Sequence, residues 1–531
     1  MDLIGRCVRK ATAHQKSGSD RDVQTADHRG GEFYLDDETH MEITGPSMTI
    51  PFPRWKGIDH CIDRRHSLIV IAGEEVRIIA RLAVSNDDRI FVRFAAGLPN
   101  ISDDGLTLEL VFFPTPTGTS EIPIASFYLE GGEQGPYWRE AELGITHLSG
   151  REGNVGIRCL PGPLNDPRGD WLAISDLCIA REDRMALTKA RSFQGLRSRN
   201  EIEHFSHVYR HSMYTQNQRS QAEMAKGIVR PFRKWRTLDE SDRDDTNGQI
   251  KMVEPTPGET PYDYGMRLLA ANIPQPSPDF LGHLEKLVER QGRVRILSLC
   301  SGAARIEADF ASRAGPSVEW SLLDINPDLL RMASEQFAPE LKLDLIETNV
   351  NELSFNDEKW DVIMCVSAMH HVVELERLME FCHRSLNPDG EFWSLGEYVG
   401  RNGNRLWPDA LAEANSILMD LPEKYRRNRN TSQVDTEMPT NDYSVGCFEG
   451  IRSEDIEPLL DRWFVPVDVY RRNCFLWRLL NQAYCDNYDL NENKDREWIY
   501  RMVEREMAHF RKGGRATELF GIYRPRPFQK D

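Results

Sequence analysis

The chain has 531 residues, of which 40% are hydrophobic and 28% charged, and its formal net charge at pH 7 is −18. This length exceeds what one hydrophobic core serves and predicts two to four domains. The negative charge argues against general nucleic-acid binding, because phosphate groups require a positive surface. The longest apolar runs, such as SLIVIAG, are far shorter than the roughly 20 residues of a membrane span, so we expect a protein without a transmembrane helix.

Residues 1–45 contain basic residues but no continuous apolar segment of the kind that a secretory signal needs. We therefore expect a flexible N-terminal segment and a cytoplasmic location. The ten cysteines are widely separated and form neither a CxxC pair nor a Cys/His cluster at zinc spacing. They are interpreted as small buried hydrophobic residues, and we predict no metal site.

Short runs with strand character, separated by Gly, Pro, Asn and Asp turns, dominate residues 46–182. This spacing is typical of a β-sandwich. The segments WREAELGITHLSGREGNVGIRCL and GDWLAISDLCIA resemble jelly-roll modules of the galactose-binding kind. The resemblance leaves two interpretations open, namely a carbohydrate-binding domain and a sandwich that serves only structure or assembly.

Residues 183–260 are polar, with apolar residues at three- and four-residue intervals, and they end in the acidic stretch DESDRDDTNGQ. The pattern predicts a helical connector followed by a linker. Within it, the basic segment 227–236 is interpreted either as a solvated linker face or as a contact for an anionic substrate or lipid.

From residue 261 to residue 531, helical and strand patterns alternate. Such alternation predicts a parallel sheet with helices on both faces, and hence a multidomain protein with an α/β C-terminal part. Two further strand-like segments, near 464–473 and 516–525, suit an antiparallel pair that closes the sheet. The first strand, residues 294–299, leads into the small-residue turn CSGAA and then into a helix.

In an open α/β sheet a ligand lies outside the carboxyl ends of the strands, near the point where the strand order reverses. This rule gathers residues 299–304, Asp324, Asn349 and the segment after Met364 around one pocket. Asp324, 22 residues after Gly302, is placed to accept hydrogen bonds from two ribose hydroxyls. Asn349 ends the third strand, where its amide can meet an adenine edge.

Five segments in this order, ILSLCSGAA, LLDIN, ETNVNEL, WDVIMCVSAMHHV and RSLNPDGEFW, resemble the landmarks of class I S-adenosylmethionine-dependent methyltransferases. The resemblance implies a Rossmann-like domain with a seven-stranded sheet and S-adenosyl-L-methionine as cofactor. It also implies the following cofactor-binding residues: Ser298, Cys300, Ser301, Gly302, Asp324, Ile325, Asn349, Val350 and Val366.

The chain departs from the family pattern at the first strand and its loop. Ser298 stands where the family has an acid, and Cys300 and Ala304 stand at positions rich in glycine. A serine hydrogen-bonds more weakly than a carboxylate, whereas Ala304 costs little if its φ is negative. A dinucleotide dehydrogenase is the competing interpretation, but the G-x-G-x-x-G spacing is absent and the closing strand pair belongs to methyltransferases.

Methyl transfer to oxygen requires in-line alignment of acceptor, methyl and sulfur, and a base if the acceptor is a hydroxyl. His370 and His371, just past the fourth strand, are the candidate bases, although one imidazole could instead cap the following helix. Glu397, at the end of the fifth strand, is an alternative base.

Residues 401–463 exceed what a connection needs and predict a lid or acceptor-binding insertion, and residues 475–514 predict a helical insertion. Segments of this region look similar to bacterial methyltransferases of glycan and polysaccharide biosynthesis. We expect Trp407 either to stack on a sugar or to anchor the lid, and Arg452 either to contact the acceptor or to pair with Glu449 or Asp455. The predicted acceptor-binding residues are Tyr398, Arg401, Asn402, Trp407, Glu449 and Arg452.

These features together predict a methyltransferase that O-methylates a sugar or glycan precursor. Two alternatives remain, namely methylation of a small-molecule natural product and a non-catalytic scaffold whose altered loop no longer holds the cofactor. The sequence leaves the oligomeric state open.

Overall fold

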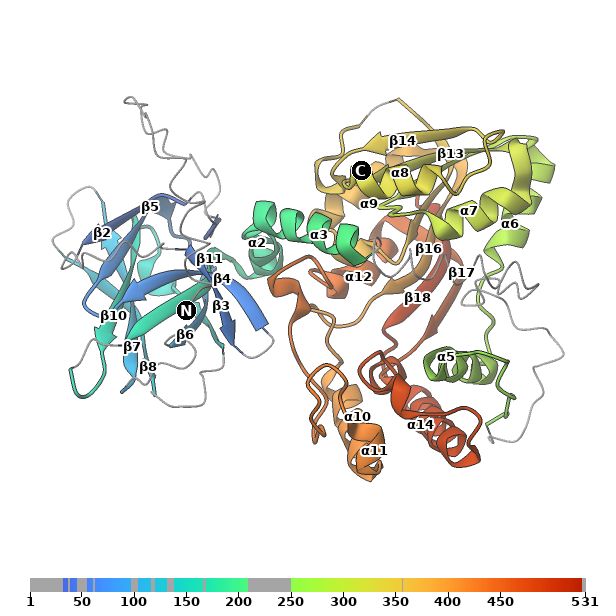
Figure 1. Cartoon of the computed structure of the whole chain (residues 1–531). Coiled ribbons are helices and arrows are strands. Elements are labelled where there is room, and N and C mark those ends of the chain that lie inside the picture. Colours follow the sequence, from blue (N-terminus) through green and yellow to red (C-terminus); the bar gives the residue numbers. More distant parts are fainter. Residues whose placement is uncertain are drawn as a thin grey trace. The chain divides into compact units, whose positions relative to one another are not determined.

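The computed structural model describes residues 32–36, 39–44, 55–60, 63–96, 104–115, 120–130, 138–165, 169–208, 250–355 and 357–527. The chain divides into two compact units (Figure 1), which are described separately. The first comprises residues up to His60 and Ser67–Thr188, and the second comprises Cys61–His66 and Lys189–Asp531. The basic segment 227–236 lies outside the described residues.

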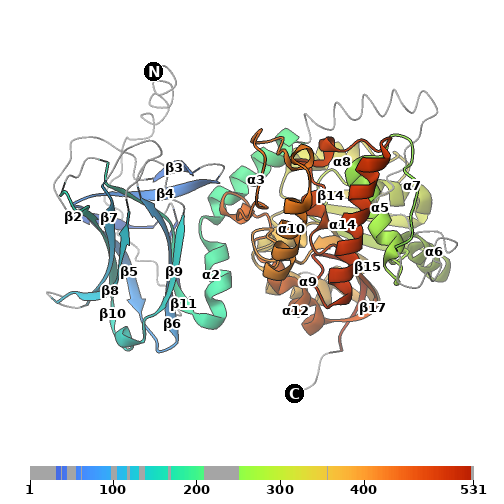
Figure 2. The ribbon, with the colours of Figure 1, turned by 90° about the horizontal axis from the view of Figure 1, so that it is seen from below.

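Two antiparallel sheets form the N-terminal unit and lie face to face (Figure 2). One sheet has the order β3 (Trp55–His60), β4 (Asp63–Ile71), β11 (Trp171–Arg181), β6 (Asp88–Ala96) and β9 (Arg139–Gly144), with β1 (Phe33–Tyr34) paired to β11. The other has the order β2 (Met41–Thr44), β5 (Glu75–Ala83), β10 (Glu152–Pro161), β7 (Leu106–Pro114) and β8 (Ile122–Leu129).

Strand β7 shows why this part of the sequence folds as a sheet. Leu106, Leu108, Leu110 and Phe112, two residues apart, are fully buried, as the two-residue period of a strand with one buried face requires. The predicted β-rich N-terminal domain is therefore confirmed. Its boundary at residue 46 is corrected, because β1 and β2 already belong to the two sheets.

The second unit contains a seven-stranded sheet in the order β14-β13-β12-β15-β16-β18-β17. The first five strands of this order are parallel, and β18 runs antiparallel to both β16 and β17. This confirms the predicted parallel sheet and its closing pair. The strands span Val294–Leu299 (β12), Val318–Asp324 (β13), Leu343–Glu347 (β14), Trp360–Val366 (β15), Leu386–Tyr398 (β16), Phe464–Arg472 (β17) and Glu518–Pro525 (β18).

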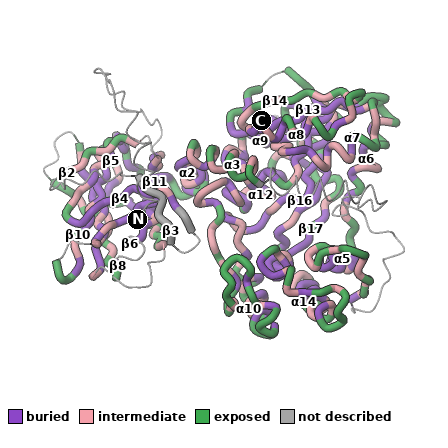
Figure 3. The backbone as a smooth tube through the Cα atoms, viewed as in Figure 1, coloured by how far each residue is buried: buried purple, intermediate pink, exposed green. Residues whose placement is uncertain are grey.

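Neighbouring residues of the central strands belong to different cores, one on each face of the sheet. Ile296 and Met364 pack in one cluster, whereas Leu297 and Ile363 pack in the other, and both layers are seen as buried chain in Figure 3. The first face is covered by α5 (Pro261–Asn272), α6 (Phe280–Gln291), α7 (Arg305–Ala314) and α8 (Pro327–Ser334). The second is covered by α9 (Leu375–Ser385) and α12 (Ser453–Trp463).

The long insertions add helices to the first face. Region 401–463 contains α10 (Pro408–Asp420) and α11 (Glu423–Arg426), and the helical insertion contains α13 (Leu476–Leu479) and α14 (Asn493–Arg511). Helix α10 contacts both α13 and α14, and their apolar residues share one core with α5. Much of the predicted lid therefore packs as a structural layer.

The predicted connector begins with α2 (Met185–Arg191) and α3 (Gln194–Val208). In the described parts of the chain, no helix combines the length and apolar character that crossing a bilayer demands.

Candidate active site

A cavity of about 310 Å³ lies at the carboxyl ends of β12, β13 and β15. The strand order reverses between β12 and β15, so the cavity occupies the position where open α/β sheets bind ligands. All the predicted cofactor-binding residues except Ser298 line it. The lining residues from the sheet side are Cys300, Ser301, Gly302, Ala304, Arg305, Ile306, Glu307, Asp324, Ile325, Asn326, Leu329, Thr348, Asn349, Val350, Asn351, Val366, Ser367, Ala368, His371 and Phe448.

The loop after β12 has the left-handed backbone that glycine favours, although two of these positions hold cysteine and alanine. Cys300, Gly302 and Ala304 have φ values of 50°, 54° and 48°, in the left-handed region that favours glycine. The condition under which alanine would cost little at position 304, a negative φ, is therefore not met. For a residue with a Cβ this conformation costs about 1–2 kcal/mol, and the loop retains it at two such positions.

Replacing Ala304 with glycine is expected to leave stability unchanged or to raise it, because the relief of left-handed strain offsets the greater chain entropy of glycine. The matched control is Ala308→Gly, inside α7, where glycine costs about 1 kcal/mol. Urea unfolding midpoints of both variants check this. An equal loss in the two variants would contradict the strained geometry.

Asp324 ties this loop to the end of β13. Its carboxylate accepts backbone N–H groups from Gly302 at 2.8 Å and from Asn326 at 2.8 Å. Burial raises the pKa of Asp324, although these two donors oppose the shift. The carboxylate is thus held at the cavity wall, where the sequence predicted it.

A second carboxylate reaches the cavity from α7. Ser298 is fully buried, and its hydroxyl donates to Glu307 Oε1 at 2.6 Å. Glu307 lines the cavity, and burial raises its pKa to about 7. The helix that follows therefore places a carboxyl group beside position 298.

Helix α3 forms the opposite wall and was missed as part of the site. Ser198, Glu201, Ile202 and Phe205 line the cavity, and Asn326 Nδ2 donates to the hydroxyl of Ser206 at 2.9 Å. The sequence pattern indicated a helix here, but no local signal connected it with the pocket.

Asn349, the residue predicted to meet adenine, lies two residues after the end of β14 at Glu347 and has a local role as well. Asn349 lines the cavity, while its side-chain oxygen accepts from the N–H of Asn351 at 3.1 Å and its amide donates to Glu352 at 2.8 Å. The amide is thus held in one orientation by the turn that follows the strand.

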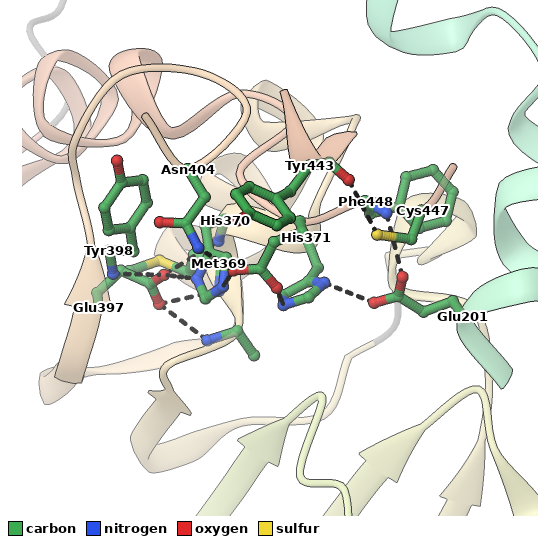
Figure 4. A network of polar contacts seen from close by, with 12 residues as sticks. Glu201, Met369, His370, His371, Glu397, Tyr398, Asn404, Tyr443, Cys447 and Phe448 are labelled. Carbon is green, nitrogen blue, oxygen red and sulfur yellow. Dashed lines mark hydrogen bonds and ion pairs between the residues drawn. The ribbon is translucent and has the colours of Figure 1, made fainter. Parts of the chain in front are cut away.

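The two histidines lie on the turn Met369–His371 after β15, and each contacts a different carboxylate (Figure 4). His370 Nδ1 lies 2.6 Å from Glu397 Oε1. His371 Nδ1 lies 2.5 Å from Glu201 Oε1, as an ion pair without the alignment of a hydrogen bond. Of the two, His371 lines the cavity.

Glu397 serves to position His370. It is fully buried and accepts the backbone N–H groups of Ala368, Met369 and His370. Burial opposes ionisation, but His370 and these donors outweigh it and lower the pKa of Glu397. Its lone pairs are engaged and it does not line the cavity, which favours this positioning role, and the identity of the base stays a prediction.

His371 lies in a field of carboxylates. Burial lowers its pKa, but Glu201, Glu449 and Glu397 outweigh burial and raise it to about 9. Its Nε2 lies 3.4 Å from Glu449, and the Nε2 of His370 lies 3.7 Å from the same side chain. Glu449 is thus the one predicted acceptor residue that joins the histidines.

The other predicted acceptor residues have structural partners. Tyr398 packs edge-on against His370 at 6.0 Å, and its hydroxyl donates to the carbonyl of Arg405. None of the six lines the cavity in the described part of the chain. Arg401 forms a backbone β-bridge with Arg405, and the side-chain oxygen of Asn402 accepts the N–H of Glu454. The guanidinium of Arg515 lies over the ring of Trp407. Arg452 forms ion pairs with Glu376 and Asp455.

Comparison with known proteins agrees with this geometry. A family model described as "Methyltransferase domain" matches residues 296–390. The chain is 27% identical over 103 residues to a ubiquinone/menaquinone biosynthesis C-methyltransferase of Bradyrhizobium diazoefficiens, covering 19% of this chain and 41% of the relative. It is 26% identical over 98 residues to a 2-phytyl-1,4-naphtoquinone methyltransferase of Nostoc sp., covering 18% and 43%. The chain thus spans about two fifths of the length of these relatives.

Among solved structures, a plantazolicin methyltransferase in complex with SAH is similar over 50% of this chain and 86% of that chain, with 12% identity and a TM-score of 0.26. The YcgJ protein of Bacillus subtilis is similar over 47% and 98%, with 15% identity and a TM-score of 0.26.

Proposed function

We propose that this chain, whose C-terminal part contains a class I S-adenosylmethionine-dependent methyltransferase domain, transfers the cofactor's methyl group to a hydroxyl of a small-molecule acceptor. The observation that carries the proposal is the single cavity lined by the left-handed loop 300–304, Asp324 and His371. Cofactor-binding groups and a candidate acceptor-activating group therefore open into the same space.

The cavity residues around loop 300–304 suit a ligand that consists of a nucleoside and an attached amino acid. Asp324 presents a carboxylate whose oxygens retain lone pairs for ribose hydroxyls. Glu307 offers a carboxylate to an ammonium group, and Ile325 and Val350 are apolar neighbours for a flat base. The bound cofactor supplies a methyl group on a sulfonium, and these side chains orient it.

Acceptor activation is assigned to the cluster of His370, His371 and Glu449. His371 opens into the cavity, and the carboxylates around it stabilise positive charge. This cluster is therefore assigned to remove the proton of the acceptor hydroxyl or to stabilise the negative charge that develops on its oxygen. Glu201 and Glu397 hold the two imidazoles in place.

A sugar or glycan precursor is the acceptor that we propose from the sequence resemblance. One of the curated relatives is named a ubiquinone/menaquinone biosynthesis C-methyltransferase, so carbon methylation of a small molecule is the alternative reaction. Trp407 gives no support for a sugar platform, because the guanidinium of Arg515 lies 3.3 Å above its ring.

The test begins with cofactor binding. Isothermal titration of the full chain with S-adenosylhomocysteine should give one site, and Asp324→Ala should weaken it by at least tenfold, since a buried carboxylate that organises the loop is lost. Asp344→Ala, an exposed aspartate on the neighbouring β14, is the matched control. No binding by the unaltered chain would favour the scaffold alternative.

The reaction is then tested with radiolabelled cofactor and extracts of sugar nucleotides, glycans and small molecules. A labelled product whose methyl group is bound as an ether, and is therefore not released by base, supports O-methylation. A label on carbon would replace it with the alternative reaction.

A further inference from the structure

Two adjacent histidines and a glutamate that is distant in the sequence meet at one point beside the cavity. His370, His371 and Glu449 each offer a ligand atom, and these atoms lie within 4.8 Å of one another. The Nε2 atoms lie 3.7 and 3.4 Å from the Glu449 carboxylate. Ligands of one transition-metal ion stand roughly 3–3.5 Å apart, given metal–ligand distances of about 2.0–2.2 Å. The cluster therefore has nearly the size of a metal site.

The opposite nitrogen of each imidazole is held by a carboxylate. Glu397 lies 2.6 Å from Nδ1 of His370, and Glu201 lies 2.5 Å from Nδ1 of His371. Metal-binding histidines characteristically donate their second ring N–H to a carboxylate, which fixes the tautomer and ring orientation. Here Glu397 is hydrogen-bonded to the ring of His370 and Glu201 forms an ion pair with the ring of His371, and the Nε2 atoms of both rings are turned toward Glu449.

Each of these supports is itself anchored. Glu397 accepts N–H groups from the turn that carries the histidines, and Glu201 accepts the N–H of Phe448 at 3.1 Å. Asn404 Nδ2 donates to Glu449 at 2.7 Å. The three ligand side chains are therefore pre-oriented by the turn that carries the histidines, by α3 and by the insertion.

The negative charge of the carboxylates around the histidines also favours binding of a cation. Three carboxylates, Glu201, Glu397 and Glu449, surround two imidazoles, and the histidines and Glu397 are largely buried. Neutral imidazoles would leave a net charge of −3 in a region of low dielectric, which is costly. One divalent cation held between the side chains would offset two of these three negative charges.

We propose that His370, His371 and Glu449 bind a divalent first-row transition metal, of the kind that two imidazoles and one carboxylate favour. Three protein ligands leave coordination positions open, as in catalytic zinc sites, and His371 places the site at the cavity. An acceptor oxygen bound there would lose its proton more readily, because the cation stabilises the oxyanion. This role rests on the proposed function, whereas metal binding does not.

The test uses the full chain stripped with a chelator and titrated with Co²⁺, whose visible d–d absorption reports coordination by nitrogen and oxygen. One equivalent is expected to bind, and Zn²⁺ should displace it. Glu449→Gln should weaken Co²⁺ binding at least 100-fold, and His370→Ala should do the same. Glu201→Gln should weaken it roughly tenfold to 100-fold, because the ring of His371 loses its support.

Matched controls separate the site from general effects. His204→Ala on α3 and Glu437→Gln in the insertion change exposed side chains and should bind Co²⁺ like the unaltered chain. Absence of a bound equivalent, or equal affinity in Glu449→Gln, would overturn the proposal. Because S-adenosylhomocysteine binding is titrated separately, a chain that binds metal but no cofactor would refute only the proposed function.

Discussion

Glu307→Gln is expected to weaken binding of S-adenosylhomocysteine by at least tenfold. The change is isosteric but removes the carboxylate that lines the cavity beside Ser298. A hydrogen bond to a charged group is worth about 1.5–3 kcal/mol, and the ligand's ammonium group would lose such a partner. Titration calorimetry of both proteins at pH 8 measures the difference.

The same substitution should remove a pH dependence. Burial raises the pKa of Glu307 to about 7 from its ordinary value of 4.5, so the unliganded site holds a proton below about pH 7 and only the ionised form pairs with an ammonium. Affinity should therefore rise from about pH 6 to about pH 8 in the unaltered chain and stay flat in the glutamine variant.

The stability of the unliganded chain should change in the opposite direction. A carboxyl whose pKa is raised by folding binds its proton more tightly in the folded state, so its contribution to stability falls as pH rises from about 4.5 to about 7. Glu347→Gln, an exposed glutamate on β14, is the control for both measurements. Equal affinity of the Glu307 variant and this control would refute the assignment.

The fold was largely predictable because its signals are local. Residues 294–299 form a short apolar run bounded by turn residues, and the strand has those same bounds. The order of the landmark segments placed Asp324 and Asn349 at the carboxyl ends of parallel strands, where topology brings them together. Local patterning and one topological rule therefore brought together the residues at the strand ends that line the cavity, which we propose as the cofactor half of the site.

The other half depends on contacts that no spacing reveals. Glu201 comes from α3, before the first strand of the seven-stranded sheet, and contacts His371 at the cavity wall. Glu307 was hidden because the family's acid was expected on the strand, whereas the side chain that fills this place comes from the next helix. Likewise, Glu449 meets the histidines only because a long insertion folds back over the turn.

Residues of the insertion were assigned to the acceptor because of their chemical type and their position in the chain. Charged and aromatic residues in such a region also build structure, and the two uses look alike in a sequence. Arg452 shows this clearly. Its guanidinium donates two hydrogen bonds to Glu376, one to Asp455 and one to the carbonyl of Val373, and only 4% of its surface is exposed.

Arg452→Met is therefore expected to destabilise the second unit rather than to change acceptor affinity. Arg452 is buried, but the side chains of Glu376 and Asp455 are 42% and 33% exposed. The expected loss therefore lies below the roughly 3–5 kcal/mol of a fully buried ion pair, on the order of 2 kcal/mol. Arg471→Met is the matched control, since Arg471 is half exposed in its pair with Glu457 and such surface pairs contribute about 0–1 kcal/mol. Urea unfolding measures both changes.

The decisive comparison is between stability and cofactor binding in the same variant. Arg452 joins the start of α12 to α9, on the face of the sheet away from α7 and α8, so the cavity walls keep their residues when it is replaced. Below its unfolding transition, Arg452→Met should thus bind S-adenosylhomocysteine as the unaltered chain does. A variant of normal stability that had lost only acceptor turnover would restore Arg452 to the acceptor site and contradict the structural role.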